Sequence, residues 1–246
     1  PDLLGAPIPI TGLAGDQQAA TIGQGCFAPG EAKATLGTGA FILSNMGTTA
    51  PLSSHRLLGT VLCELDGVRT YALEGSVFAA GSVIKWLRDS LGMLTSAAES
   101  ETLARSVPDS AGVVFVPALS GLGAPYWQPE ARASITGLTF AATRAHIARA
   151  ALESIAHVFS DLAQAYAADG AGWDVLRLDG GMSANDWLAQ DIANVLSLRC
   201  ERPTDVETTA RGAAILAAIG AGLFPDLAGA RGFVSRTDVF EPRMDQ

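Results

Sequence analysis

The stretch LRLDGGMSAN, residues 176–185, decides the fold class of this chain. It begins as an aliphatic strand, turns at Gly180-Gly181, and leads through Asn185 into a helix with periodic apolar residues. A second glycine turn, Gly37-Thr38-Gly39, also follows a short run with the character of a strand. Glycine has no Cβ, so such turns expose backbone N–H groups to a phosphate or let a nucleotide come close. The two turns therefore indicate an α/β protein with a phosphorylated ligand.

The predicted order of strands and helices agrees with this class. Antiparallel strands come first, because Asp66-Gly67 between residues 58–65 and 68–73 is a strong hairpin signal. From Gly75 the apolar period becomes helical, which predicts a helix up to residue 91. The other expected elements are strands at 32–38, 41–45, 112–117 (buried), 134–138, 175–178 and 199–201, and helices at 16–24, 143–158, 185–196 and 208–222. We therefore expect a mixed β-sheet flanked by helices, with ligands at the carboxyl ends of its strands.

Composition excludes several classes of protein. With 246 residues, 48% hydrophobic and 17% charged, the chain forms one large or two small globular domains. Its longest apolar stretch, about 13 residues, is too short to span a bilayer. The net charge of −9, without a run of Lys or Arg, argues against nucleic-acid binding. An anionic ligand must then be held locally, by Mg²⁺, backbone N–H groups and helix N-termini.

The cysteines and histidines indicate no metal or disulfide chemistry. Three widely spaced cysteines are typical of buried thiols in a reducing compartment, so we expect the cytoplasm. The three histidines lack metal-ligand spacing. The first residues, PDLL, contain no basic region and no initiator Met, and are expected to be an internal cut and not a secretory signal.

Three polar or aromatic residues near the glycine turns are candidates for catalysis and substrate binding. Asp16 could take the proton of an acceptor hydroxyl during phosphoryl transfer, or it could cap the helix that follows it. Gln17 could hydrogen-bond a second hydroxyl, and Phe41 could cover an apolar edge of a small polyol. Taken singly, each of these residues is more often structural, and Gly37-Thr38-Gly39 alone is more often a tight turn without a ligand.

The loop LSGLGAPYW, residues 119–127, is unusually rich in glycine, proline and aromatic residues. Functional loops are often built in this way. A rigid packing loop around Trp127 explains the same composition, and this interpretation is slightly favoured.

Several segments, taken in their order along the chain, resemble one family. They are GDQQA at 15–19, GTG at 37–39, GSVF at 75–78, GLGAPYW at 121–127 and DGG at 179–181. Together with residues 137–138 and 146–153, they look like the carboxy-terminal half of the FGGY carbohydrate kinases, from about residue 12 to residue 242. Several motifs in one order are far more specific than any one of them.

The resemblance implies an actin-like, ribonuclease H-like domain that binds ATP, with Mg²⁺, against a partner domain. It implies that Asp16 is the catalytic base and that Gln17 and Phe41 contact the polyol. The nucleotide contacts that it implies are Thr38, Gly39, Gly81, Lys85, Gly181 and Asn185. Lys85 departs from the family pattern, because members that phosphorylate glycerol usually carry Gln at this position.

The resemblance also predicts how the chain divides. Residues 1–22 are expected to be a hinge segment from a missing amino-terminal domain, and residues 23–246 to be the carboxy-terminal, nucleotide-binding domain. The family's Asp-Gly-Thr phosphate-binding turn is absent from the sequence. The isolated chain is therefore expected to fold but to turn over little or no substrate. The oligomeric state is left open.

Three functions compete at this point. The leading one is ATP-dependent phosphorylation of glycerol to glycerol 3-phosphate by the complete kinase, because Gln17 and Phe41 suit a small triol. The second is phosphorylation of another polyol or ketose, such as erythritol or xylulose. The third is a non-catalytic, actin-like nucleotide-binding module, against which Asp16 argues because a module that only binds ATP needs no base there.

Overall fold

A seven-stranded mixed sheet forms the centre of the domain, with the strand order β3-β4-β2-β1-β7-β8-β9. The structure is a computed structural model that describes residues 5, 7–234 and 238–243. Strand β1 pairs antiparallel with β2 and parallel with β7. It is therefore the strand at which the antiparallel half of the sheet meets the parallel half. The strands of this sheet are β1 (Ala32–Leu36), β2 (Ala40–Gly47), β3 (Leu58–Leu65), β4 (Val68–Val77), β7 (Val175–Asp179), β8 (Arg199–Arg202) and β9 (Asp238–Phe240).

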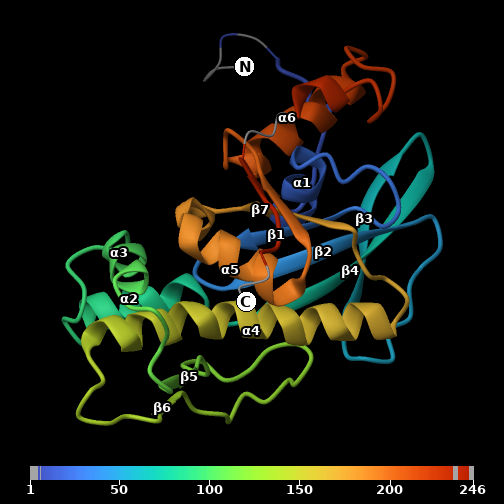
Figure 1. Ribbon diagram of the computed structural model, residues 1–246. Helices are drawn as coiled ribbons and strands as arrows, with labels where there is room; N and C mark the ends of the chain where they lie inside the picture. Colours follow the sequence, from blue (N-terminus) through green and yellow to red (C-terminus); the bar gives the residue numbers. More distant parts are fainter. Residues whose placement is uncertain (1–4, 6, 235–237, 244–246) are drawn as a thin grey trace.

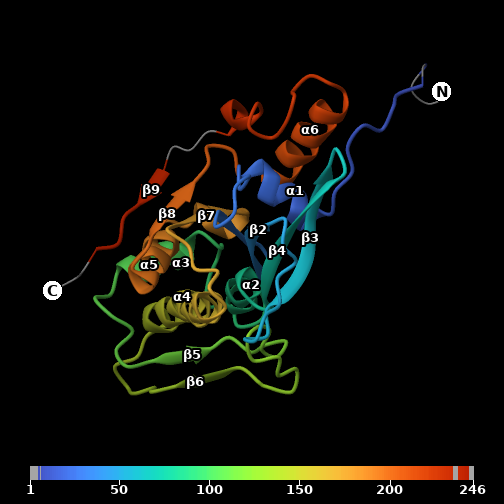
Figure 2. The same cartoon turned by 90° about the vertical axis from the view of Figure 1, so that its right-hand side faces the viewer.

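Helices cover both faces of the sheet (Figures 1 and 2). Helices α1 and α6 lie on one face, and the long helix α4 crosses the other with α5 beside it. A two-stranded ribbon, β5–β6, lies on the outer side of α4, away from the sheet (Figure 2). The remaining elements are α1 (Asp16–Gly23), α2 (Gly81–Asp89), α3 (Glu99–Arg105), β5 (Val114–Val116), β6 (Ser134–Thr136), α4 (Arg144–Ala168), η1 (Gly181–Ala184), α5 (Asp186–Leu196), α6 (Thr208–Gly220) and η2 (Arg231–Phe233).

The two faces of the central strands differ in chemistry. In β1, Ala32, Ala34 and Leu36 belong to the large apolar cluster that includes α4. Side chains alternate along a strand, so Lys33 and Thr35 point to the opposite face, where α1 and α6 pack. The sheet therefore presents an apolar face to α4 and a face with buried polar groups to α1 and α6.

The predicted fold class, a mixed sheet flanked by helices, is confirmed. The predicted helix after Thr143 is confirmed as α4, whose first turn is closed by reciprocal hydrogen bonds between Thr143 and His146. The predicted start of a helix at Gly75 is wrong, because β4 continues to Val77 and pairs with β2 through Ala40. Gly75 also packs against Leu162 of α4. These tertiary contacts favour a strand at residues whose apolar pattern suits a helix equally well.

Three further elements differ from the sequence predictions. Strand β5 was predicted to be buried, but Val114 is 56% exposed because β5 pairs with β6 outside the main sheet. Helix α3 was missed because it has seven residues and few apolar ones. Strand β9, three residues at the sheet edge, was also missed. Among the described residues, no helix combines the length and the apolar character needed to cross a membrane.

The glycine-rich loop at residues 119–127 packs tightly against the end of β4. The backbone N–H of Ala124 donates to the carbonyl of Ser76 (2.9 Å), and a Cβ on Gly123 would lie 2.1 Å from the same oxygen. The Trp127 ring meets Phe78 edge-on, with 5.9 Å between centroids, and its indole N–H donates to the carbonyl of Arg56 (2.7 Å). The packing interpretation of this loop is therefore the one that fits the structure.

The crossing of α1 and α6 should tolerate no side chain at its glycines. A Cβ on Gly212 would lie 1.7 Å from the carbonyl oxygen of Ala19. Alanine normally favours a helix over glycine by about 1 kcal/mol, but here we expect Gly212→Ala to lower the free energy of unfolding by about 2 kcal/mol or more. Urea denaturation measures the change. Gly172→Ala is the control, because its nearest neighbour would be 3.9 Å away. A Gly212→Ala variant as stable as the control would contradict the close crossing.

Candidate active site

The candidate site lies where β1 and β7 end side by side. The parallel register pairs Thr35 with Asp179, the last residue of β7. The turn Gly37-Thr38-Gly39 therefore lies next to Gly180. Gly180 has a φ of +82°, and a Cβ there would lie 2.6 Å from the carbonyl oxygen of Leu36. Glycine is required at this position for both its conformation and the close approach of the two strand ends.

The turn at Thr38 is held by backbone hydrogen bonds and by the start of α2. The Thr38 carbonyl accepts from the N–H groups of Ala80 and Ser82, each at 3.0 Å, and Gly81 N–H donates to the Gly37 carbonyl (2.9 Å). A Cβ on Gly81 would lie 2.5 Å from that same carbonyl oxygen. The Thr38 side chain is exposed. The turn is thus fixed from below, while its hydroxyl is accessible to a ligand.

A small cavity of about 160 Å³ lies beside Gly181. Gly181 has no atom within 4 Å of where its Cβ would be, so this backbone is open. Asn185 caps α5 by accepting the N–H of Leu188 (2.9 Å), and its amide donates to Ser100 Oγ in α3 (3.3 Å). Helix α3, which the sequence did not predict, therefore forms part of this wall. The lining residues are Ala97, Ala98, Glu101, Gly181, Met182, Ala184 and Asn185.

Asp16 and Gln17 form the opposite side of the site, at the start of α1. Asp16 is exposed, and its Oδ1 accepts the backbone N–H of Gln17 (2.8 Å). Gly15 occupies the N-cap position, so Asp16 lies inside the first turn, where its carboxylate satisfies one of the first N–H groups of the helix. A carboxylate there is favoured by the helix dipole.

Lys33 is the residue of this site that the sequence prediction missed. It is 0% exposed in the central strand β1, and its ammonium donates to Gln17 Oε1 and to Thr35 Oγ1 (2.8 Å). Thr35 in turn lies opposite Phe41 in the register of β1 and β2. Lys33 therefore binds one predicted polyol contact, Gln17, and Thr35, the register partner of the other. The available signal was the alternation AKAT at residues 32–35, with polar residues on one face of a strand.

Burial lowers the pKa of Lys33 from 10.5 to about 8, and the acidic groups around it oppose that shift. These groups lie on β7, α1 and β4 as well as in the loop after α1, and the largest effect is that of Asp179. Asp179 is 1% exposed, and its Oδ2 accepts from Gln24 (2.8 Å) and Thr208 (2.7 Å). Its Oδ1 has no partner among the residues that the structure describes. The other contributors are Cys26, Glu74 and Asp16.

The remaining predicted residues lie around the two glycine turns. Gly39 approaches β4 closely, since its Cβ would lie 2.4 Å from the Val77 carbonyl oxygen. Lys85 is exposed on α2, one helical turn beyond Gly81. A Cβ on Gly81 would also lie 3.0 Å from Met182 Cγ, which places α2 next to η1. The structure thus brings the predicted contacts together at one end of the central strands, where β1 and β7 terminate.

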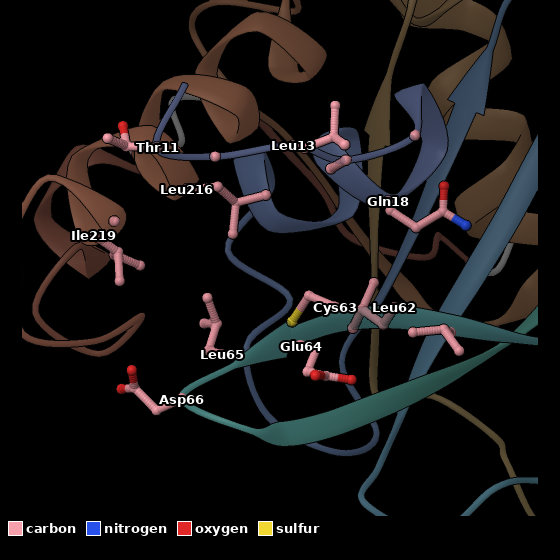
Figure 3. Close-up of a pocket in the computed structure, with 15 residues that line it drawn as sticks. Thr11, Leu13, Gln18, Leu62, Cys63, Glu64, Leu65, Asp66, Leu216 and Ile219 are labelled. Carbon is pink, nitrogen blue, oxygen red and sulfur yellow. The ribbon is translucent and has the colours of Figure 1, made fainter. Parts of the chain in front are cut away.

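A larger cavity, about 690 Å³, borders the start of α1, where Gly15 and Gln18 line it (Figure 3). Its other walls come from residues 11–14, β3 with the turn at Asp66, and α6, and Figure 3 shows Leu13, Leu65 and Leu216 from these segments. Its charged lining residues are Glu64 and Asp66, and no Lys or Arg of the described residues lines it. Such a lining offers a phosphate no cation. In the described part of the chain, no group of three or more His, Cys, Asp or Glu could hold a metal ion.

The mixed sheet flanked by helices is the actin-like ATPase fold of the solved kinase structures that this chain resembles. Residues 32–221 match the FGGY family of carbohydrate kinases, C-terminal domain. The chain belongs to this family.

Its similar proteins are carbohydrate kinases of about twice its length. A glycerol kinase from Rhodospirillum centenum is 52% identical over 99% of this chain and 49% of its own length. A glycerol kinase from Coxiella burnetii is 48% identical over 99% of this chain and 49% of its own length. Among solved structures, Plasmodium falciparum glycerol kinase with ADP is 37% identical, with a TM-score of 0.87 over 94% of this chain and 46% of its own. Xylulose kinase from Rhodospirillum rubrum is 26% identical, with a TM-score of 0.80 over 94% and 46%. The chain thus spans about half the length of these relatives.

Lys33 should make stability depend on alkaline pH. The folded chain disfavours its ammonium form, and this penalty is relieved as pH rises through about 8. We therefore expect the free energy of unfolding of the wild type, relative to Lys33→Met, to rise by about 2 kcal/mol from pH 7 to pH 9.5. Urea unfolding at several pH values measures the difference. Parallel pH curves for the two proteins would count against a buried ammonium group.

Proposed function

We propose that this chain is the carboxy-terminal, nucleotide-binding part of a kinase that transfers the γ-phosphoryl group of ATP to glycerol, giving glycerol 3-phosphate. The observation that carries the proposal is the placement of Asp16 and Gln17 on the same sheet edge as the two glycine turns. The similarity to glycerol kinases at 52% and 48% identity supports glycerol as the acceptor.

In the proposed reaction, the hydroxyl oxygen of the acceptor forms a bond to the γ-phosphorus as the bond to the bridging oxygen of ADP breaks. Asp16 takes the hydroxyl proton, which suits an exposed carboxylate with one oxygen fixed by the N–H of Gln17. Gln17 and Phe41 contact the acceptor. Transfer of this kind depends mainly on positioning and charge neutralisation.

The nucleotide is proposed to lie across the two glycine turns. The exposed Thr38 hydroxyl, Gly39 and Gly81 would face the phosphates, with Lys85 nearby on α2. The open backbone of Gly181 and the cavity next to it would receive the adenosine, with Asn185 holding the wall in place through Ser100. The neighbour solved with ADP supports a nucleotide in this class of protein.

Mg²⁺ fits this site as an ion that arrives with the nucleotide. Magnesium keeps several waters and is bound through one or two carboxylates together with substrate phosphates. Asp16 offers such a carboxylate, because its side chain is exposed at the sheet edge where the phosphates are proposed to lie. The ion would neutralise charge on the transferring phosphoryl group.

We further propose that residues 1–22 connect to an amino-terminal domain and that residues 23–246 form the carboxy-terminal domain. All of helix α1 except Gly23 falls within the connecting segment, and the helix packs on α6, where Gly23 lies against Thr208. Movement of the amino-terminal domain would therefore be transmitted to Asp16 through α1, a helix that is packed on the carboxy-terminal domain. The cytoplasm is our proposal for the compartment, supported by the three free cysteines.

A second candidate is a kinase for another polyol or ketose. The similarity in fold to a xylulose kinase favours it, and erythritol and xylulose are the acceptors to compare. The complete kinase, with Mg-ATP and each acceptor in turn, tests both candidates by ADP release. Turnover with glycerol above the no-acceptor control supports the first, and turnover with another acceptor alone supports the second. Binding of ADP without any turnover would support a non-catalytic module.

Asp16→Asn in the complete kinase should abolish most turnover. Loss of a general base typically costs about 10²- to 10⁴-fold in rate, whereas the amide keeps the size of the side chain. ADP affinity, measured without Mg²⁺, should stay within about twofold, because Asp16 is proposed to contact the acceptor and the ion but not the nucleotide itself. Coupled ADP-release kinetics and calorimetric ADP titration measure the two quantities. Unchanged turnover would remove Asp16 from the proposed chemistry.

Gly181→Val should weaken nucleotide binding without affecting folding. Its new side chain would enter open space beside the 160 Å³ cavity and occupy the proposed adenosine position. We expect ADP affinity to fall by at least about tenfold and the unfolding midpoint to remain close to that of the wild type. Gly232→Val is the matched control, because that position is equally open but lies in η2. Equal ADP affinity in the two variants would place the adenosine elsewhere.

A further inference from the structure

Lys33 lies in a place where a lysine is costly. Its side chain is completely buried between the central sheet and α1, in a row with Leu43 of β2 and Arg177 of β7. Taking an ammonium group out of water is unfavourable unless its protons find acceptors. An apolar side chain of similar volume would fill such a position at least as well for stability.

A direct ion pair does not explain this lysine. Asp179 exerts the largest charge effect on Lys33. However, the hydrogen bonds that the Asp179 carboxylate accepts come from Gln24 and Thr208. The ammonium of Lys33 instead donates to two neutral oxygens, Gln17 Oε1 and Thr35 Oγ1. The lysine therefore holds Gln17, which is a proposed acceptor contact, and Thr35, which is the register partner of Phe41.

The contact with Lys33 fixes which end of the Gln17 amide faces outward. A lysine ammonium has three donors and no acceptor, so the amide must turn its oxygen to Lys33. The Gln17 NH₂ group is then left for other partners. Gln17 is half-buried and directly follows Asp16, so this donor lies beside the carboxylate proposed to take the proton.

We propose that Lys33 is a positioning residue for the acceptor: by binding Gln17 Oε1 from below, it commits the Gln17 NH₂ group to donate to a hydroxyl oxygen of the polyol. This inference rests on the proposed function, and it goes further by assigning a source of selectivity. A site built to donate to a hydroxyl discriminates against an acceptor that lacks it, because the buried donor is left unpaired. Without Lys33, the amide can rotate and the discrimination weakens.

The test compares Lys33→Met with the wild type in the complete kinase, using Mg-ATP and glycerol, propane-1,2-diol or propane-1,3-diol. Each diol lacks one hydroxyl of glycerol. For Lys33→Met we expect the KM for glycerol to rise by at least about tenfold, with kcat within about threefold and the KM for ATP within about twofold. The preference for glycerol over at least one diol, as a ratio of kcat/KM, should fall by about tenfold.

Two more variants separate positioning from a structural role. Lys33→Gln keeps an N–H donor without the charge and should recover most of the glycerol preference. Gln17→Glu keeps an oxygen towards Lys33 but replaces the outward donor by an acceptor, so it should lose the preference even though Lys33 is intact. Gln17→Glu also keeps the test decisive if Lys33→Met does not fold. Arg69→Met, at an exposed position on β4, is the matched control and should behave as the wild type.

The outcomes distinguish this inference from the proposed function. If the wild type turns over none of the acceptors, the proposed function fails and the inference fails with it. If the wild type is active but Lys33→Met keeps its KM for glycerol and its preference over the diols, the inference alone is overturned. Equal rises in KM for ATP and glycerol would also overturn it, because they indicate a general disturbance of the fold. Retained preference in Gln17→Glu would do the same.

Discussion

The parallel pairing of β1 with β7 is the constraint on which the rest of the site depends. It brings two chain segments that are far apart in sequence to one sheet edge, where Thr35 and Asp179 are register partners. The contact is close enough that Gly180 admits no Cβ beside Leu36. Because the two parallel strands end at the same level, the glycine turns that follow them lie next to each other. One backbone contact thus places the proposed phosphate side and adenosine side within one surface.

The α1- and α6-facing side of this sheet gives up stability at the residues proposed to carry the chemistry. Its central strands bury Lys33 and Asp179, whereas the α4-facing side is filled with apolar residues that can supply the folding energy. Proteins commonly break the rules of core composition at functional sites and compensate elsewhere. The close glycine contacts between α1 and α6 belong to the same arrangement, because they hold α1, and with it Asp16 and Gln17, over the polar strands.

Much of this arrangement could be predicted from the sequence. The glycine turns, the Asp66-Gly67 hairpin and the long helix after Thr143 carry local signals that the fold respects. The burial of Lys33 could not be predicted, since a lysine in a five-residue strand suggests an exposed edge until the neighbouring strands are known. Helix α3 could not be predicted because it is short and is stabilised by tertiary contacts with α4 and α5. A helix was predicted at the end of β4 because the small apolar residues there fit the period of a helix as well as that of a strand.

Charge distribution explains how an acidic chain can still serve an anionic ligand. Of its 16 basic residues, two are lysines, Lys33 and Lys85. The arginines are mostly bound in ion pairs, such as Arg177 with Glu31 and Arg149 with Glu153. Neither lysine forms such a pair within the residues that the structure describes. Lys33 lies beneath the proposed acceptor side and Lys85 on the proposed nucleotide side, so both of these lysines lie where phosphoryl transfer is proposed. Local placement, and not net charge, then decides where an anion binds.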